Sequence, residues 1–221
     1  MDLLLIIIIV LPLVANLYIK SAYNKYRKIS NLKEMTGFDV ARRILDSNGL
    51  NEVLILETNG ELSDHYNPRR KVVKLSRDIY HGETIAAMSV AAHECGHALQ
   101  DKDNYWFLKL RTLLVPIVNI CSNIGYIFVV IGFLLEYFDL FFLGIGLSMF
   151  GVLFNLITLV VEFDASNRAG KEMERLNITT EDTVKESESM LKAAAFTYVA
   201  ALLTNVLQLL RLVMIMNSRR D

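Results

Sequence analysis

The sequence predicts a mainly α-helical protein with a small β-sheet, in which a folded hydrophilic domain is combined with transmembrane helices. Of the 221 residues, 53% are hydrophobic and 21% are charged, and the mean hydropathy is +0.35. These values are high for a soluble domain. Long apolar runs alternate with two hydrophilic segments, the first of which contains short strand-like runs between helical patterns. The net charge of -1 gives no support to nucleic-acid binding.

Four apolar stretches have the length of about 20 residues that a membrane-spanning helix needs. They cover 3–19, 113–135, 140–161 and 193–216. The first lacks a basic leading region and a small-residue cleavage site, so we expect a retained anchor and not a signal peptide. The fourth is the weakest, because Gln208 and Arg211 interrupt it. Arg211 could extend its charge to the membrane surface, or this helix could lie partly against the protein.

Basic residues near the ends of these stretches predict the orientation in the membrane. They flank the two hydrophilic segments, at Lys20, Lys25, Arg27, Lys28, Lys109, Arg111, Arg168, Lys171, Arg175 and Lys192. The turn between the second and third stretches carries Glu136 and Asp139 and no basic residue. We therefore expect the N-terminus outside and both hydrophilic segments in the cytoplasm, although Arg219 and Arg220 would then lie outside.

This pattern divides the chain into five expected parts. They are an N-terminal membrane anchor over 1–19, a cytoplasmic segment over 20–112, a transmembrane helix pair over 113–161, a second cytoplasmic segment over 162–192, and a C-terminal transmembrane or membrane-associated helix over 193–221. The two cytoplasmic parts would come together on one side of the membrane, because two spans separate them.

The first cytoplasmic segment has the order helix, small sheet, helix. Apolar spacing predicts a helix over 35–47, ended by Asn48-Gly49. Strands are expected over 53–57 and 71–75, and 64–68 is expected as a turn that Pro68 helps to form. A long helix then starts near Gly82. A strand beside that helix, for which 71–75 is the candidate, could hold an extended peptide by backbone pairing.

The most informative motif is His-Glu-Cys-Gly-His at residues 93–97, which has the H-E-x-x-H pattern of zinc metalloproteases. His93 and His97 are four apart on a predicted helix, so both imidazoles can reach one metal ion. Glu94 can take a proton from a metal-activated water. Gly96 would cost about 1 kcal/mol in an ordinary helix, so we expect another backbone or a ligand to approach it closely. The alternative is a helix with two satisfied histidines and an exposed glutamate.

A catalytic zinc usually has three protein ligands and one open position. The best candidate for the third ligand is Glu162, at the junction of the third apolar stretch and a hydrophilic helix, where an unpaired carboxylate would be costly. The alternative reading is a charge that marks the end of the span. Asp164 is the rival ligand. Ser166, one turn after Glu162, could hydrogen-bond a metal ligand.

Other candidate side chains remain less defined. His65, in a polar turn, could contact substrate or an oxyanion, but a surface histidine is the favoured interpretation. His81 is interpreted as a residue at a helix start. Tyr66 and Tyr80 could each donate a hydrogen bond to an oxyanion, and nothing in the sequence selects between them.

The two cysteines provide no disulfide framework, because Cys95 lies inside the motif and Cys121 inside an apolar stretch. We expect Cys95 to pack into the core, since the two histidines define the ligand face of the helix. A reducing compartment fits this usage.

These motifs together resemble those of a known family. The residues concerned are Leu-Ser-Asp-His-Tyr-Asn-Pro-Arg at 62–69, Leu-Ser at 75–76, Ala-Ala-His-Glu-Cys-Gly-His-Ala-Leu-Gln at 91–100 and Val-Glu-Phe-Asp-Ala-Ser at 161–166. They look like the YugP-like neutral zinc metallopeptidases, over nearly the whole chain. The resemblance implies a zincin-like metalloprotease domain in a membrane-bound zinc peptidase, with His93 and His97 as ligands and Glu94 as the catalytic acid and base.

A more distant similarity is to the HtpX-like and CAAX-prenyl-protease-like membrane gluzincins. Their third ligand is the glutamate of an E-F-x-A-D type segment, which corresponds to Glu162 here. This chain departs from the pattern at Ser166, where those relatives carry aspartate. The departure removes no ligand, but the surroundings of the ligands need not be the same.

We therefore expect a multi-pass membrane protein, with one catalytic Zn²⁺ held by His93, His97 and Glu162. It would be an endopeptidase that cleaves peptide or membrane-protein substrates at the cytoplasmic membrane face, with Glu94 as general base. The alternatives are a non-hydrolytic membrane scaffold with a structural metal site and a helical membrane-partner protein with no metal. The lipid bilayer is the expected surrounding, and no nucleic-acid partner is expected.

Overall fold

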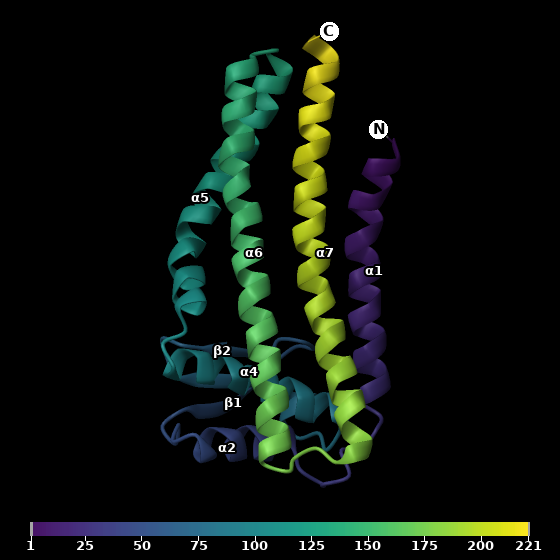
Figure 1. The fold of residues 1–221 in the computed structure, drawn as a ribbon, viewed down its shortest axis with the longest axis vertical. Coiled ribbons are helices and arrows are strands. Elements are labelled where there is room, and N and C mark those ends of the chain that lie inside the picture. Colours follow the sequence, from purple (N-terminus) through teal and green to yellow (C-terminus); the bar gives the residue numbers. More distant parts are fainter. Residues whose placement is uncertain (1, 221) are drawn as a thin grey trace. The chain divides into compact units, whose positions relative to one another are not determined.

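The computed structural model describes residues 2–220, without the side chains of Asp2, Arg219 and Arg220. Its elements are α1 (Asp2–Tyr26), α2 (Gly37–Ser47), β1 (Leu54–Thr58), β2 (His65–Asn67), β3 (Val72–Ser76), α3 (Arg77–Tyr80), α4 (Ile85–Lys102), α5 (Trp106–Leu134), α6 (Phe138–Arg175) and α7 (Glu181–Arg220). Figure 1 shows this order along the chain. The mainly α-helical fold with a small sheet and apolar helices is as the sequence predicted.

The chain forms two compact units. One unit consists of Met1–Asn16, Trp106–Val160 and Thr197–Asp221, and the other of Leu17–Tyr105 and Val161–Phe196. Helices α1, α6 and α7 each continue from one unit into the other. The second unit, which we call the motif unit, contains the H-E-x-x-H helix and Glu162, so all candidate site residues can be described within it.

Four helices within residues 2–220 are long and apolar enough to cross a membrane. They correspond to α1, α5, α6 and α7, and each is longer than the apolar stretch from which it was predicted. α6 continues past the expected membrane boundary to Arg175, and α7 starts at Glu181. Gln208 and Arg211 do not interrupt α7. The division of the chain into five parts remains a prediction.

The sheet has the strand order β1-β3-β2, with β1 parallel and β2 antiparallel to β3. The two predicted strands are present, each displaced by one residue. The expected turn at 64–68 was wrong, because β2 forms there. The reasons are tertiary: the Asp64 carboxylate accepts the backbone N–H of Ser76 at 2.6 Å, which ties β2 to the end of β3. Pro68 follows β2, so its missing N–H costs the ladder nothing.

This strand order also corrects the expected peptide-binding strand. β3, which contains most of the predicted run 71–75, is central and pairs on both sides. It therefore has no free edge for a substrate. Within the described chain, the unpaired edges belong to β1 and β2, and β2 is the edge strand that contacts α4.

The ends of the helices follow from their capping residues. α2 starts at Gly37, where Thr36 and Asp39 form a capping box, and it ends at Asn48 before Gly49, whose φ is +71°. The predicted start of the motif helix at Gly82 was too early. α4 is preceded by the separate short helix α3, and the Thr84 hydroxyl caps α4 by accepting the Ala87 backbone N–H at 3.2 Å.

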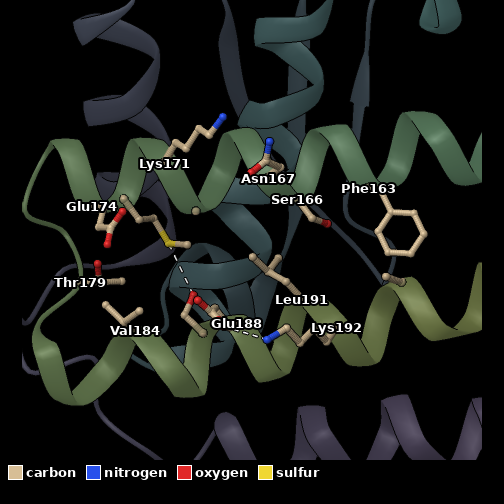
Figure 2. Close-up of a pocket in the computed structure, with 14 residues that line it drawn as sticks. Phe163, Ser166, Asn167, Lys171, Glu174, Thr179, Val184, Glu188, Leu191 and Lys192 are labelled. Carbon is tan, nitrogen blue, oxygen red and sulfur yellow. Dashed lines mark hydrogen bonds and ion pairs between the residues drawn. The ribbon is translucent and has the colours of Figure 1, made fainter.

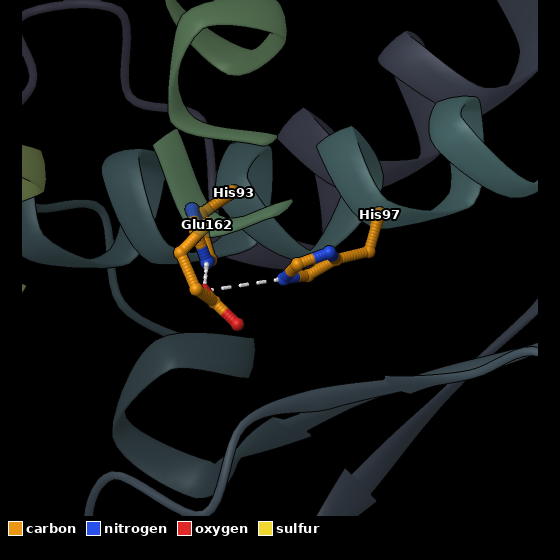
Figure 3. Close-up of side chains that lie close together, drawn as sticks. All are labelled: His93, His97 and Glu162. Carbon is orange, nitrogen blue, oxygen red and sulfur yellow. Dashed lines mark hydrogen bonds and ion pairs between the residues drawn. The ribbon is translucent and has the colours of Figure 1, made fainter. Parts of the chain in front are cut away.

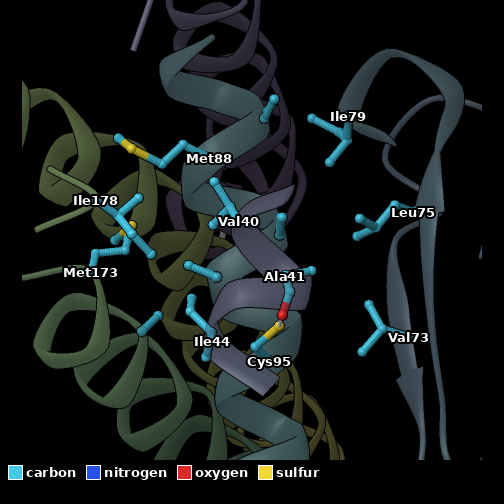
Figure 4. Packing of buried hydrophobic residues seen from close by; sticks show 14 of the residues in the cluster. Val40, Ala41, Ile44, Val73, Leu75, Ile79, Met88, Cys95, Met173 and Ile178 are labelled. Atoms are coloured by element: carbon cyan, nitrogen blue, oxygen red, sulfur yellow. Dashed lines mark hydrogen bonds between the residues drawn. The ribbon is translucent and has the colours of Figure 1, made fainter. Parts of the chain in front are cut away.

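The core of the motif unit lies around α4, which is buried along most of its length. Figure 4 shows Val40 and Ile44 of α2 beside α4, with Val73 and Leu75 of the sheet facing them. Cys95 is fully buried there, and its Sγ lies 3.6 Å from the carbonyl oxygen of Ala41. This confirms that Cys95 packs into the core, away from the other motif side chains.

Candidate metal centre

The relative position of the candidate ligands follows from a close crossing of α4 and α6. A Cβ added to Gly96 would lie 2.3 Å from the carbonyl oxygen of Ala165, so a larger residue would force the two helices apart. The expectation of a close backbone approach at Gly96 is therefore confirmed. Glu162 precedes Ala165 by one helical turn, and His93 and His97 lie on either side of Gly96 in sequence. The crossing thus brings a carboxylate of α6 to the two imidazoles of α4.

The three side chains converge on one point in Figure 3. The Oε2 atom of Glu162 lies 3.2 Å from Nε2 of His93 and 3.5 Å from Nε2 of His97. One ligand atom from each residue lies within 4.8 Å of the other two. Glu162 and His97 are buried, with exposures of 2% and 8%, and the His93 side chain is 14% exposed. The sequence-predicted ligand set is thus assembled in one partly closed site.

These distances suit a zinc ion. A tetrahedral ion with nitrogen and oxygen ligands at about 2.0–2.1 Å sets neighbouring ligand atoms roughly 3.3 Å apart. The two distances from Glu162 to the imidazoles, 3.2 and 3.5 Å, are close to this value. Two imidazole nitrogens and one carboxylate oxygen are also a donor set of the catalytic zinc type. The donor set fits the ion and leaves one coordination position for a water or substrate.

Comparison with known proteins decides the family. A family model described as "Putative neutral zinc metallopeptidase" matches residues 1–217. The chain belongs to this zinc metallopeptidase family. A relative from Bacillus subtilis (strain 168), named "Putative membrane protease YugP", is 44% identical over 212 residues, which cover 94% of this chain and 92% of that protein. No solved structure matches the chain.

Glu94 of this metallopeptidase is buried beside the candidate ligands, with an exposure of 7%. Burial raises the pKa of the Glu94 carboxyl to about 7, opposed by the nearby charge of His93 and by the backbone N–H of Tyr66, while Glu162 and Asp64 add to the rise. A carboxyl in this range can both accept and release a proton near neutral pH. The alternative interpretation from the sequence, in which Glu94 is exposed to solvent, is therefore wrong.

The outer nitrogens of the two imidazoles have different hydrogen-bond partners. Nδ1 of His97 lies 3.0 Å from Oε1 of Gln100, and Nδ1 of His93 lies 3.2 Å from Oγ of Ser166. Ser166 therefore contacts a candidate ligand, as its spacing from Glu162 suggested. Sequence reasoning missed Gln100, although its position three residues after His97 places it on the same helix face.

Asp164, the rival ligand, is held elsewhere. Its Oδ2 accepts hydrogen bonds from Gln100 Nε2 at 2.9 Å and from Arg168 Nε at 2.7 Å. It is not part of the group formed by His93, His97 and Glu162. This location favours Glu162 over Asp164 as the carboxylate of the centre.

The remaining histidines lie outside the centre. His65 is exposed on β2, with Nδ1 2.8 Å from the carbonyl oxygen of Ser63. His81 is exposed after α3, with Nε2 2.9 Å from Oε2 of Glu57. The exposed position of His65 matches the surface interpretation, although it lies on β2 and not in a turn. The interpretation of His81 as a residue at a helix start was wrong, because His81 caps the C-terminal end of α3 and α4 starts only at Ile85.

Tyr66 approaches the site with its backbone, whereas its side chain turns to the end of α4. Its hydroxyl donates to Oδ2 of Asp101 at 2.7 Å, and Nζ of Lys71 lies 2.6 Å from the same oxygen. Burial, and then the contact with Asp101, raise the pKa of the Tyr66 hydroxyl far above its usual value. The Tyr66 hydroxyl therefore stabilises the fold through its hydrogen bond to Asp101. The Tyr80 ring packs 5.1 Å from that of Phe38, centroid to centroid.

A cleft of about 540 Å³ lies between the motif-unit parts of α6 and α7 (Figure 2). Its lining includes the apolar Phe163 and Leu191 together with Ser166. The lining also includes two lysines and two glutamates, Lys171, Lys192, Glu174 and Glu188. The charge of the cleft therefore favours neither anionic nor cationic ligands. The hydroxyl that contacts His93 is therefore also part of the wall of a space large enough for a small ligand.

Proposed function

We propose that this family member is a membrane-bound, zinc-dependent endopeptidase that hydrolyses peptide bonds at the cytoplasmic membrane face. The observation that carries the proposal is the convergence of His93, His97 and Glu162 from two distant segments, at distances that suit one tetrahedral ion. Membership in a zinc metallopeptidase family supports the same reaction class.

In this proposal His93, His97 and Glu162 hold the ion, and Glu94 moves the proton. An ion held there would polarise the scissile carbonyl as a Lewis acid and would lower the pKa of water at the open position. Glu94 takes a proton from the attacking water and later delivers it to the nitrogen of the leaving amine. The buried position of Glu94, beside the three candidate ligands, places its carboxyl where both proton transfers would take place.

The substrate would bind in extended form along the free edge of β2. This strand pairs with β3 on one side only and contacts α4. The backbone N–H of Tyr66, in the middle of β2, is close enough to Glu94 to lower its pKa. A peptide paired with this edge would therefore bring its scissile carbonyl close to Glu94.

We place the motif unit on the cytoplasmic side because basic residues flank the two predicted hydrophilic segments, 20–112 and 162–192, which contain most of it. In the same proposal 1–19, 113–161 and 193–221 form the membrane part. The substrates would be peptides or membrane-protein segments that reach this surface.

The alternative of a non-hydrolytic scaffold with a structural metal site is less well supported. Structural zinc sites are usually closed by four protein ligands. Within the described residues the candidate group has three members, and a buried acid lies beside it. An open position beside a proton acceptor is the arrangement that hydrolysis needs.

The proposed function is tested with Glu94→Gln in the purified full-length protein. We expect the variant to retain zinc and to lose cleavage of casein and of extended peptides, because only the proton acceptor is removed. Glu181→Gln, an exposed change in the first turn of α7, is the matched control and should cleave at the parent rate. Equal cleavage by parent and Glu94→Gln would overturn the proposed mechanism.

A further inference from the structure

Gln100 is a fully buried amide beside the candidate centre. Its exposure is 0%, and it lies on α4 one turn after His97. Its Oε1 is 3.0 Å from Nδ1 of His97, and its Nε2 is 2.8 Å from the carbonyl oxygen of Val161 and 2.9 Å from Oδ2 of Asp164. A buried amide with all of these contacts has little freedom to turn.

The contacts fix which end of the amide faces His97. The carbonyl oxygen of Val161 can only accept a hydrogen bond, and the carboxylate of Asp164 also accepts one from Arg168 at 2.7 Å. The NH₂ group of Gln100 must therefore face these two acceptors. Its oxygen then faces His97, and an oxygen acceptor requires a proton on Nδ1. In the neutral ring, Nε2 keeps its lone pair and faces the centre.

His93 differs from His97 in this respect. Its Nδ1 faces the hydroxyl of Ser166 at 3.2 Å, and a hydroxyl can either donate or accept. Its Nε2 lies 3.2 Å from Oε2 of Glu162, which accepts. A neutral His93 with the proton on Nε2, accepting at Nδ1 from Ser166, satisfies both contacts. Nε2 of His97 lies farther from the same oxygen of Glu162, at 3.5 Å, than its Nδ1 lies from Gln100, at 3.0 Å. The Gln100 contact therefore decides the proton position of His97, and the two imidazoles have opposite proton positions before metal arrives.

The amide is itself held by the helix that carries the third candidate ligand. Val161 immediately precedes Glu162, so the hydrogen bond from Gln100 fixes His97 against the backbone of α6. Arg168 continues the network from Asp164 to Asp103, just after α4. Gln100 thus connects the orientation of the His97 imidazole to the backbone of α6 next to Glu162.

We propose that Gln100 is a positioning residue that presets His97 as the Nδ1–H tautomer, with Nε2 free to bind metal, in the metal-free protein. This inference rests on the proposed zinc centre. Partners of this kind typically change metal affinity by about 10- to 100-fold when they are removed. Ser166 gives His93 no such preset tautomer, because its hydroxyl can turn.

The test uses full-length protein in detergent micelles, labelled with ¹⁵N at histidine and freed of metal, at a pH where the rings are neutral. Ring ¹⁵N chemical shifts report the tautomer of each histidine directly. We expect His97 as the Nδ1–H form and His93 as the Nε2–H form. A metal-free His97 that carries its proton on Nε2 would overturn the proposal without any variant.

Two substitutions at Gln100 then separate positioning from packing. Gln100→Met keeps the length of the side chain and removes its polar atoms, so His97 should lose its preset tautomer and zinc should bind about 10- to 100-fold more weakly. Gln100→Glu retains an oxygen acceptor for Nδ1–H but loses the NH₂ donor to Val161 and Asp164, so it should retain the tautomer and lower the unfolding temperature. An unchanged His97 tautomer together with unchanged zinc affinity in Gln100→Met would contradict the proposal.

The matched control is Ser89→Ala. Ser89 is also buried on α4 and bonds to Ser187 at 2.9 Å, but it makes no contact with either imidazole among the described hydrogen bonds. This change should lower the unfolding temperature and leave the His97 tautomer as it is. If the parent protein binds no zinc, the proposed function fails, whereas the tautomer in the metal-free protein still decides the role of Gln100.

Discussion

The carbonyl oxygen of Ala165 lies against Gly96, so close that an added Cβ would be 2.3 Å from it. This contact joins α4 to α6 between the two histidines of the motif. It fixes the distance between the helix that supplies the imidazoles and the helix that supplies Glu162. The glycine of the motif is therefore as important to the geometry of the centre as the polar residues.

Gly96→Ala should separate the two helices and weaken the centre. Overpacking a buried contact costs about 1–3 kcal/mol of unfolding free energy, and the shift would move Glu162 away from the imidazoles. We expect a lower unfolding temperature and a lower zinc content in the purified variant.

Gly170→Ala is the matched control, because an added Cβ there has no atom within 4 Å. It should leave zinc content unchanged and stabilise α6 by up to about 1 kcal/mol through helix propensity. Equal stability and zinc content in the two alanine variants would contradict the role given to the Gly96–Ala165 contact.

Tyr66→Phe should loosen β2 with little effect on the metal. The hydroxyl donates to Asp101 at 2.7 Å, and its loss leaves a partly buried carboxylate with one partner fewer. We expect about 1–2 kcal/mol lower unfolding free energy and a higher KM for peptides, with normal zinc content. Tyr80→Phe, whose hydroxyl makes no hydrogen bond among the described contacts, should behave as the parent does. A Tyr66→Phe enzyme with parent KM would argue against substrate binding along β2.

The proposed orientation is tested by thiol labelling in intact cells. Leu135→Cys lies in the turn between α5 and α6, and Glu52→Cys lies in the loop between α2 and β1. A membrane-impermeant thiol reagent should label Leu135→Cys in intact cells and Glu52→Cys only after the cells are opened. Labelling in the reverse order would place the motif unit outside the cytoplasm.

Much of the candidate centre could be predicted because its determinants are local. The spacing of His93 and His97 places them on one face of any helix, whatever the tertiary structure. Glu162 could be found because a pair of apolar stretches, if both span the membrane, would return the chain to the side from which it left. The close approach of another backbone to Gly96 could be predicted because glycine is unfavourable inside an ordinary helix.

The features that were missed depend on contacts between distant segments. β2 is three residues long, and it is held by pairing with β3 and by the hydrogen bond that the Ser76 backbone N–H donates to the Asp64 carboxylate. The partners of Gln100 lie in another helix, far along the chain. No local sequence pattern predicts such contacts, because they form only when the helices pack against each other.

The most direct measurement of the central claim is the zinc content of purified Glu162→Gln, with Glu174→Gln as the control at an exposed position on the same helix. The parent and the control should each hold one zinc ion and lose thermal stability when a chelator removes it. Glu162→Gln should hold far less zinc and should unfold at the same temperature with or without chelator. Full zinc retention in Glu162→Gln would contradict a centre built from His93, His97 and Glu162.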